Sequence, residues 1–190
     1  MGAAMQSGFS IDGTTGLLRE ARQVLSPHFD ERPQGTPLEL IVVHGISLPP
    51  GEFGGPYIEH LFTGGLDPNA HPYFAAIASM RVSSHLLVRR NGEVVQFVPF
   101  GMRAWHAGES SWQGRPACND FSIGIEMEGT DDGAYEAAQY QALAALISAL
   151  CETYPTLARE RVVGHSDISP ERKTDPGPAF TWPLLRQLLS

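Results

Sequence analysis

The pattern of apolar positions predicts several strands of one sheet. The segment 38–44 is a nearly continuous apolar run, rich in β-branched residues, that ends in a polar residue, which is typical of a buried strand. The segment 121–128 alternates apolar and polar side chains, so one face should join the core while the other carries two glutamates. The dipeptide Asn91-Gly92 tolerates the positive φ of a type I′ turn and predicts a hairpin. The predicted strands are 38–44, 82–89, 93–100, 121–128 and 161–165.

Apolar residues spaced three and four apart predict the helices. The clearest case is the stretch 140–151, an amphipathic helix that Pro155 ends. The stretch 17–25 has helical spacing but is short, so it could equally be extended. Because strands and helices are mixed rather than strictly alternating, we expect an α/β fold with a central mixed β-sheet flanked by helices. Shorter helices are predicted at 56–62, 72–80 and 182–189.

The length and the composition fit one domain. A chain of 190 residues without an internal repeat or a linker between apolar halves is expected to form a single unit. We assign residues 1–16 to an N-terminal tail and residues 17–190 to this domain. Gly 20 and Pro 15 are high counts that indicate long ordered loops, where functional sites are often built. Cys118 and Cys151 are expected to be free thiols.

The net charge limits the classes of partner. Lys+Arg 13 against Asp+Glu 21 gives a formal charge of −8, which opposes binding to nucleic acid or to an anionic membrane. The stretch 1–13 has no basic residue and no apolar block, and the longest apolar run, 142–151, is about half of the ~20 residues that a membrane helix requires. We therefore expect a cytoplasmic protein that partners neither nucleic acid nor membrane. As a separate expectation, we take the protein to be a monomer.

Three polar residues have the types and positions of a metal site. His44 and His165 each end an apolar strand and open a loop, so neighbouring strands would bring both imidazoles to one edge of the sheet. Asp175 lies ten positions after His165, and a looped return of the chain could bring the two side chains together. Three nitrogen and oxygen ligands of this kind hold Zn²⁺ and leave a fourth position for water. The alternative is that Asp175 only caps a turn before Pro176-Gly177.

A lysine and two glutamates could supply further chemistry. Lys173 is the only lysine in the chain, which suggests that its position needs a compact ammonium group, although chance retention on a surface loop would leave the same pattern. Glu126 and Glu128 project from the same face of one strand and could provide a general base and a partner for a metal ligand. The alternation does not say which glutamate does which, and a solvated strand face is the alternative.

Four separated segments resemble one known family over almost the whole chain. The most specific are Val-His-Gly-Ile-Ser-Leu-Pro-Pro-Gly from Val43 and Pro-Glu-Arg-Lys-Thr-Asp-Pro-Gly from Pro170. They look like segments of the cytoplasmic 1,6-anhydro-N-acetylmuramyl-L-alanine amidases (AmpD type), within the type 2 N-acetylmuramoyl-L-alanine amidases. Two positions depart from the family pattern, since Gly45 stands where asparagine is usual and Ser166 where cysteine is usual. The four segments are 43–54, 103–108, 118–126 and 170–177.

The resemblance implies a fold, a reaction and a set of residue roles. The fold would be that of the type 2 amidases and the peptidoglycan-recognition proteins. The reaction would be hydrolysis of the amide between the lactyl group of 1,6-anhydro-N-acetylmuramic acid and L-alanine, with an anhydromuropeptide as substrate. The resemblance assigns Glu126 as the catalytic carboxylate and Lys173 as the cation that stabilises the transition state, and it leaves Glu128 a supporting role. It also assigns His44, His165 and Asp175 as zinc ligands.

Substrate binding and two rival functions complete the expectations. Arg81 is expected to pair with a carboxylate of the peptide, and Trp105 to stack on the sugar. A solvated arginine and a half-buried core tryptophan are the alternatives. His106 is given no role beyond lining the site. The rival functions are an amidase that acts on intact peptidoglycan and a module that binds muropeptides without cutting them.

Overall fold

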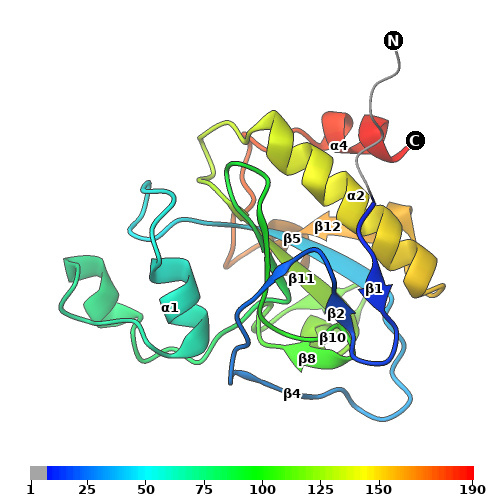
Figure 1. Cartoon of the computed structure of the whole chain (residues 1–190), viewed down its shortest axis with the longest axis horizontal. Coiled ribbons are helices and arrows are strands. Elements are labelled where there is room, and N and C mark those ends of the chain that lie inside the picture. Colours follow the sequence, from blue (N-terminus) through cyan, green and yellow to red (C-terminus); the bar gives the residue numbers. More distant parts are fainter. Residues whose placement is uncertain (1–7) are drawn as a thin grey trace.

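The fold of residues 8–190, which a computed structural model describes, is built on a six-stranded sheet. The strand order is β12-β5-β11-β6-β7-β3, and Figure 1 shows helix α2 (Ala137–Thr153) lying across this sheet. The first four strands run parallel, β6 and β7 form an antiparallel hairpin, and β7 pairs parallel with β3. The predicted mixed sheet and its hairpin are therefore confirmed, but the type I′ turn is not: Gly92 has a positive φ of 86° whereas Asn91 does not, and the backbone N–H of Gly92 bonds the carbonyl oxygen of Arg89. The strands are β3 (Arg22–Gln23), β5 (Leu40–Ile46), β6 (Leu86–Val88), β7 (Val94–Gln96), β11 (Ser122–Glu128) and β12 (Val162–Gly164).

The helices flank the sheet, as predicted. α2 begins with the backbone N–H of Glu136 bonded to the side chain of Gln139, and it ends before Pro155. Part of the predicted helix 72–80 forms only a 3-10 helix. The predicted strand 161–165 ends at Gly164, and His165 begins one helical turn that extends into the predicted loop. The remaining helices are α1 (Tyr57–Thr63), α3 (His165–Ile168) and α4 (Trp182–Leu189), with 3-10 helices η1 (Pro72–Ala76), η2 (Cys118–Asp120) and η3 (Arg159–Arg161).

Three small two-stranded sheets surround the centre. The stretch 17–25 is extended, not helical, because it pairs locally and adds β3 to the central sheet. Residues 8–16, part of the predicted tail, pack on the fold: Ile11 lies in a strand paired with β2, and Phe9 contacts the main core. Residues 1–7 of that tail lie outside the described residues. The small sheets pair β1 (Ile11–Asp12) with β2 (Leu17–Leu18), β4 (Phe29–Glu31) with β8 (Met102–Ala104), and β9 (Ser111–Trp112) with β10 (Arg115–Pro116).

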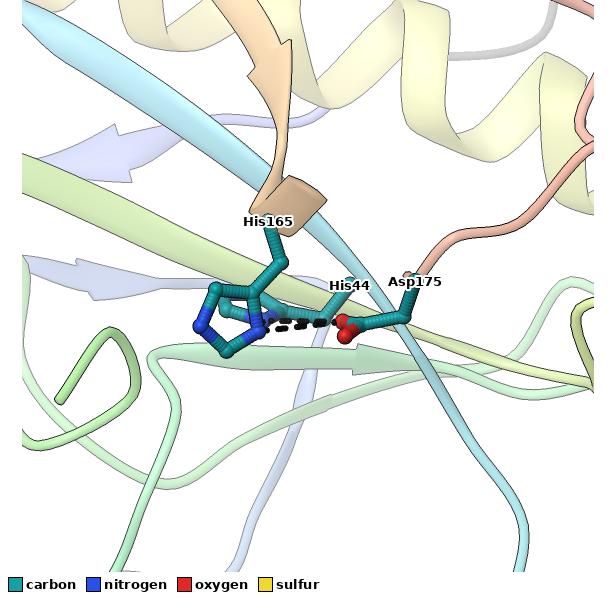
Figure 2. Close-up of side chains that lie close together, drawn as sticks. All are labelled: His44, His165 and Asp175. Carbon is teal, nitrogen blue, oxygen red and sulfur yellow. Dashed lines mark hydrogen bonds and ion pairs between the residues drawn. The ribbon is translucent and has the colours of Figure 1, made fainter. Parts of the chain in front are cut away.

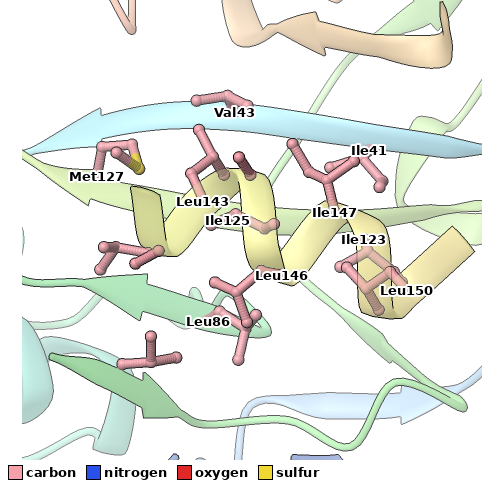
Figure 3. Close-up of a cluster of buried hydrophobic side chains, with 14 of the residues drawn as sticks. Ile41, Val43, Leu86, Ile123, Ile125, Met127, Leu143, Leu146, Ile147 and Leu150 are labelled. Atoms are coloured by element: carbon pink, nitrogen blue, oxygen red, sulfur yellow. The ribbon is translucent and has the colours of Figure 1, made fainter. Parts of the chain in front are cut away.

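The main core lies between α2 and one face of the sheet. The odd-numbered residues of β11 point toward α2, as their alternation predicts, and Figure 3 shows them interlocked with the leucines of the helix. Burial of each such aliphatic side chain stabilises the fold by about 1.5–3 kcal/mol. The contact between α2 and the sheet is therefore a major source of stability. The side chains in contact include Ile41, Val43, Leu86, Ile123, Ile125, Met127, Leu143, Leu146, Ile147 and Leu150.

The opposite face of the sheet is also covered, which excludes one alternative. A solvated face of β11 is excluded because Glu126 is only 8% exposed and Glu128 only 1% exposed. One apolar cluster covers the β6–β7 side of this face and another covers the β5–β12 side. The polar residues of β11 lie as a strip between these two clusters, where a site can form.

Two further expectations concern the chain as a whole. Cys118 is buried, Cys151 is partly buried, and both are free thiols, as expected. Within residues 8–190, no helix combines the length and the hydropathy that a membrane span requires.

Candidate metal centre and active site

The register of three parallel strands aligns the predicted site residues on one face of the sheet. His44 on β5 lies opposite Glu126 on β11. His165 directly follows Gly164, which is the register partner of the residue before His44. Asp167 stabilises this end of β12, since its Oδ2 accepts a hydrogen bond of 2.7 Å from the backbone N–H of Gly164. In-register residues of parallel strands point to the same side, so the two imidazoles and the carboxyl group share one face.

Asp175 completes a compact group of three possible metal ligands. The loop after α3 returns its side chain to the ends of β12 and β5, and the backbone N–H of Gly45 donates to its Oδ2 at 3.3 Å. The Nδ1 atoms of His44 and His165 are 3.0 Å apart. Oδ2 of Asp175 is 3.3 Å from the first and 3.2 Å from the second (Figure 2). The structure therefore brings together the predicted set His44, His165 and Asp175.

The donor atoms suit a divalent ion such as zinc. Donors about 2.0–2.2 Å from a tetrahedral zinc ion lie roughly 3.3–3.5 Å from one another, which is close to the separations here. Burial lowers the pKa of His44 to about 4, against the opposing effect of Asp175. Burial alone would raise the pKa of Asp175, but hydrogen bonds from His165 and then His44 hold it well below its usual range. A neutral imidazole and an ionised carboxylate are the forms that bind metal.

Glu126 faces the same cleft as this group. The cleft has a volume of about 290 Å³, and its walls include Glu126, the three possible ligands and Lys173. Although its backbone is paired with both neighbouring strands, the carboxyl group of Glu126 forms no hydrogen bond with any other residue in the range 8–190. Burial, and secondarily the charge of Asp175, raise the pKa of Glu126 well above its usual range, whereas Lys173 opposes the rise. A buried carboxyl group with a raised pKa and a free face toward a cleft can accept and return a proton near neutral pH.

Glu128 differs from Glu126 in its partners. Its Oε1 accepts hydrogen bonds from Nη1 of Arg89 at 3.0 Å and from the backbone N–H of Gly54 at 2.7 Å. Its Oε2 accepts one from the backbone N–H of Arg90 at 3.2 Å. Both oxygens of the Glu128 carboxylate are therefore occupied, and the group attaches the loop before α1 to the sheet. Of the two glutamates, only Glu126 has its carboxyl group available to a ligand in the cleft.

Arg81 and Trp105 lie together at the edge of the cleft. Trp105 lines the cleft, stacks on the ring of His28 and donates from Nε1 to Asp30 at 3.0 Å. The guanidinium carbon of Arg81 is 5.9 Å from the centre of the Trp105 ring. Arg81 is exposed and has no ion pair with any residue from 8 to 190, whereas Arg89, Arg90 and Arg103 are all paired with carboxylates.

His106 and one wall of the cleft contribute to the site in ways that the sequence does not predict. Nδ1 of His106 is 2.8 Å from Nε2 of His44, so His106 contacts a possible ligand directly. The signal was Gly124: a Cβ atom there would lie 2.5 Å from Cγ of His106, and an interior glycine in a strand often marks such a close approach. The missed wall is apolar and comes from the segment around α1 and η1; it comprises Leu48, Leu61, Phe62, Tyr73, Ile77 and Met80.

Known proteins share both this sequence and this fold. A family model described as N-acetylmuramoyl-L-alanine amidase matches residues 34–178. The 1,6-anhydro-N-acetylmuramyl-L-alanine amidase AmpD of Citrobacter freundii is 63% identical over 175 residues, which is 92% of this chain and 93% of that protein.

Solved structures agree with the sequence comparisons. A crystal structure of a Se-Met AmpD derivative superposes with a TM-score of 0.91 at 62% identity, covering 95% of this chain and 99% of that one. The Escherichia coli amidase AmiD, solved with the substrate anhydro-N-acetylmuramic acid-L-Ala-D-γ-Glu-L-Lys, superposes with a TM-score of 0.59 at 30% identity, covering 85% of this chain and 65% of that one. The expected type 2 amidase fold is confirmed, and the chain belongs to the N-acetylmuramoyl-L-alanine amidase family.

Proposed function

We propose that this chain is a zinc-dependent amidase of cell-wall recycling. It hydrolyses the amide between the lactyl group of 1,6-anhydro-N-acetylmuramic acid and L-alanine in soluble muropeptides. The observation that carries the proposal is one cleft in which three possible metal ligands lie beside an uncommitted buried glutamate. The high identity to AmpD of Citrobacter freundii and the anhydromuropeptide bound in the AmiD structure support this choice of substrate.

His44, His165 and Asp175 would hold the zinc ion. Their donor atoms, two Nδ1 and one Oδ2, lie within 4.8 Å of one another, and such a set leaves room for a further ligand. A zinc ion bound there supplies Lewis-acid activation of water and of the scissile carbonyl group.

Glu126 is the proton carrier of the proposed reaction. It takes a proton from the attacking water as the new C–O bond forms, and it returns that proton to the alanine nitrogen as the C–N bond breaks. General acid–base catalysis of this kind contributes roughly 10²–10⁴ in rate. The raised pKa of Glu126 suits both halves of the transfer, because burial makes its carboxylate a stronger proton acceptor than that of an exposed glutamate.

Lys173, Arg81 and Trp105 act on the substrate in this proposal. The ammonium group of Lys173, at the wall of the cleft, donates to the carbonyl oxygen as negative charge develops there. Arg81 pairs with a carboxylate of the stem peptide, for which its lack of an ion pair within residues 8–190 leaves it available. Trp105 offers a ring face to the sugar.

The proposed enzyme has a stated location, oligomeric state and domain organisation. We propose a cytoplasmic monomer in which residues 17–190 form one catalytic domain, with residues 8–16 packed against it. Two other functions would use the same cleft: cleavage of intact peptidoglycan outside the cytoplasm, and binding of muropeptides without cleavage.

One experiment separates these functions. Purified protein, loaded with zinc or treated with a chelator, is incubated with anhydromuramyl-tripeptide and in parallel with isolated sacculi. We expect release of tripeptide from the soluble substrate, loss of that activity with the chelator and its return with zinc. Faster release from sacculi would favour the enzyme of the intact wall. Binding without any cleavage, in the zinc-loaded protein, would favour the recognition module.

A further inference from the structure

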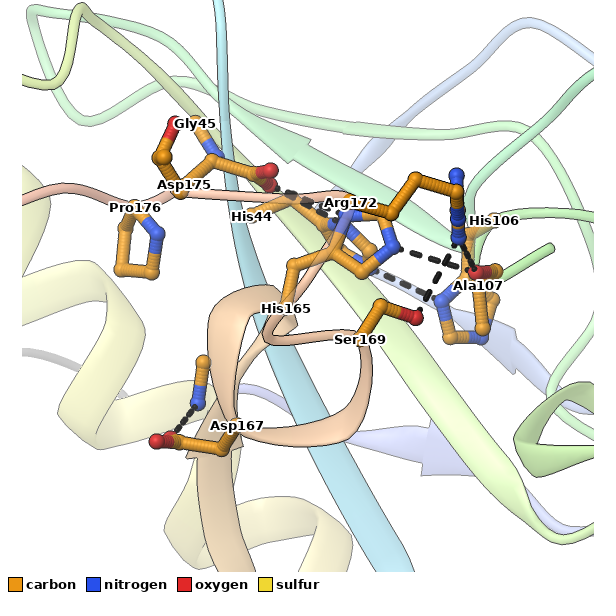
Figure 4. Close-up of polar contacts among 12 residues, drawn as sticks. His44, Gly45, His106, Ala107, His165, Asp167, Ser169, Arg172, Asp175 and Pro176 are labelled. Carbon is orange, nitrogen blue, oxygen red and sulfur yellow. Dashed lines mark hydrogen bonds and ion pairs between the residues drawn. The ribbon is translucent and has the colours of Figure 1, made fainter. Parts of the chain in front are cut away.

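His44 and His165 each contact the segment His106–Ala107 through Nε2, the ring nitrogen that faces away from Asp175. Nε2 of His44 is 2.8 Å from Nδ1 of His106. Nε2 of His165 is 3.1 Å from the backbone carbonyl oxygen of Ala107. Figure 4 shows His106 and Ala107 together on the side of the imidazoles opposite Asp175.

The positions of the hydrogens follow from this arrangement. When Nδ1 of His44 and Nδ1 of His165 bind the metal ion beside Asp175, each ring carries its hydrogen on Nε2. His44 therefore donates to His106, and His165 donates to the carbonyl group of Ala107. His106 accepts on Nδ1, so its own Nε2–H donates to Oγ of Ser122, at 3.1 Å. Each ligand ring is thus held in one tautomer and one orientation.

The His106–Ala107 segment is itself held in place. Oδ1 of Asn119 accepts hydrogen bonds from the backbone N–H of His106 at 3.1 Å and from that of Ala107 at 2.8 Å. Nη2 of Arg172 donates to the carbonyl oxygen of Ala107 at 2.7 Å. The carbonyl oxygen of Asn119 in turn accepts a hydrogen bond of 3.0 Å from Arg32. One side-chain oxygen therefore fixes both partners of the two imidazoles at once.

We propose that the His106–Ala107 segment, held by Asn119, orients the two histidine ligands for the metal ion. His106 and Asn119 are positioning residues: His106 acts on His44 directly, and Asn119 acts on both rings through the backbone. The inference rests on the proposed zinc site. Loss of an outer hydrogen-bond partner of a metal-bound histidine typically weakens metal binding 10–100-fold.

The test measures zinc affinity by competition with a chromophoric chelator, so it requires no substrate. In His106→Leu the acceptor for His44 is lost, whereas in His106→Asn an oxygen takes the place of Nδ1. Asn119→Ala removes the oxygen that accepts from both backbone N–H groups, whereas Asn119→Asp keeps an oxygen there. Asn91→Ala is the matched control for Asn119→Ala. It also removes a side-chain oxygen that accepts a hydrogen bond from a backbone N–H, that of Glu93, but it does so in the β6–β7 turn. The absorption spectrum of the cobalt-substituted protein reports ligand geometry in each variant.

We expect His106→Leu and Asn119→Ala to bind zinc about 10–100-fold more weakly than the unchanged protein. His106→Asn and Asn119→Asp should recover most of that loss, and Asn91→Ala should bind normally with an unchanged cobalt spectrum. Unchanged zinc affinity in both His106→Leu and Asn119→Ala would overturn the inference while leaving the zinc site in place. Equal losses in the paired variants would also overturn it, because they would point to general disruption of the loop. An unchanged protein that binds no zinc would overturn the proposed function together with the inference.

Discussion

Glu126 and His44 are register partners on the adjacent parallel strands β11 and β5, and both project from the face of the sheet opposite α2. The backbone of the sheet therefore sets their separation, without any hydrogen bond between the two side chains. Both strands are packed along their other face against α2, which limits relative movement of the two groups. A proton-carrying carboxyl group and a metal ligand are thus placed side by side by the most rigid part of the molecule.

The first prediction concerns the metal group. His44→Ala removes one of three converging donors and should weaken zinc binding by more than the roughly 10–100-fold expected for loss of an outer partner. Elemental analysis after gel filtration should find about one zinc ion per unchanged chain and almost none in the variant. His71→Ala is the control, because His71 is the N-cap of η1 and belongs neither to the three possible ligands nor to the residues that line the cleft. A variant that still retains one ion per chain would show that His44 is not a ligand.

The two glutamates of β11 should respond oppositely to the same substitution. Glu126→Gln should keep zinc and lower kcat by about 10²–10⁴, because the proton carrier is lost. Burial raises the pKa of Glu126, so its ionised form disfavours folding at neutral pH, and the variant should be at least as stable as the unchanged protein. Glu128→Gln weakens a buried ion pair with Arg89 and should cost about 1–3 kcal/mol in stability while zinc binding persists.

Urea unfolding in the presence of a chelator measures the stability of both variants, and steady-state kinetics measures kcat of Glu126→Gln. Near-normal turnover by Glu126→Gln would transfer the catalytic role to another group.

These glutamates show where sequence reasoning stops. Alternation places Glu126 and Glu128 on one face, but the choice between them depends on Arg89 and the loop at Gly54, which are distant in sequence. The meeting of His44 and His165 could be predicted, because both end apolar strands and strand ends of a parallel sheet gather at one edge. The return of Asp175 was only a possibility, since it depends on backbone turns between α3 and that residue that no periodicity encodes.

Lys173 should be replaceable neither by a neutral side chain nor by arginine. Lys173→Met should lower kcat by roughly 10²–10³, the usual cost of losing one donor to a developing oxyanion. Lys173→Arg keeps the charge, but its planar fork cannot occupy the position of a compact ammonium group, so it should recover only part of the loss. Zinc content should stay normal in both variants. Full activity of Lys173→Arg would mean that any cation at this wall of the cleft suffices.

Arg81 should affect substrate affinity rather than turnover. Arg81→Ala should raise KM about 10-fold or more at nearly constant kcat, since a hydrogen bond to a charged group is worth about 1.5–3 kcal/mol. The same comparison with a C-terminally amidated peptide isolates the interaction, because the unchanged protein and the variant should then differ little. Arg19→Ala serves as control, because Arg19 is paired with Asp12 in the β1–β2 hairpin. An equal effect of Arg81→Ala on both peptides would exclude the C-terminal carboxylate as its partner.

Glu59 should make the free energy of unfolding depend on pH in the acid range. It joins α1 to the sheet through ion pairs with Arg22 and Arg89, at 2.7 Å and 2.6 Å. Hydrogen bonds from Arg22 and then Arg89, against an opposing effect of burial, lower the pKa of Glu59 from 4.5 to about 2. A carboxyl group whose pKa is lower in the folded state stabilises the fold above its unfolded pKa, and that contribution disappears as pH falls through the folded value.

The stabilisation from Glu59 should therefore be complete above about pH 4.5 and be lost between about pH 4.5 and pH 2. Glu59→Gln should cost about 1 kcal/mol at neutral pH, near the upper end for partly solvated ion pairs, and should flatten the acid limb of the stability curve. Urea unfolding at a series of pH values measures both effects. Glu52→Gln, at an exposed position with no ion pair among residues 8–190, should change neither. An acid limb as steep in Glu59→Gln as in the unchanged protein would assign that limb to other carboxylates.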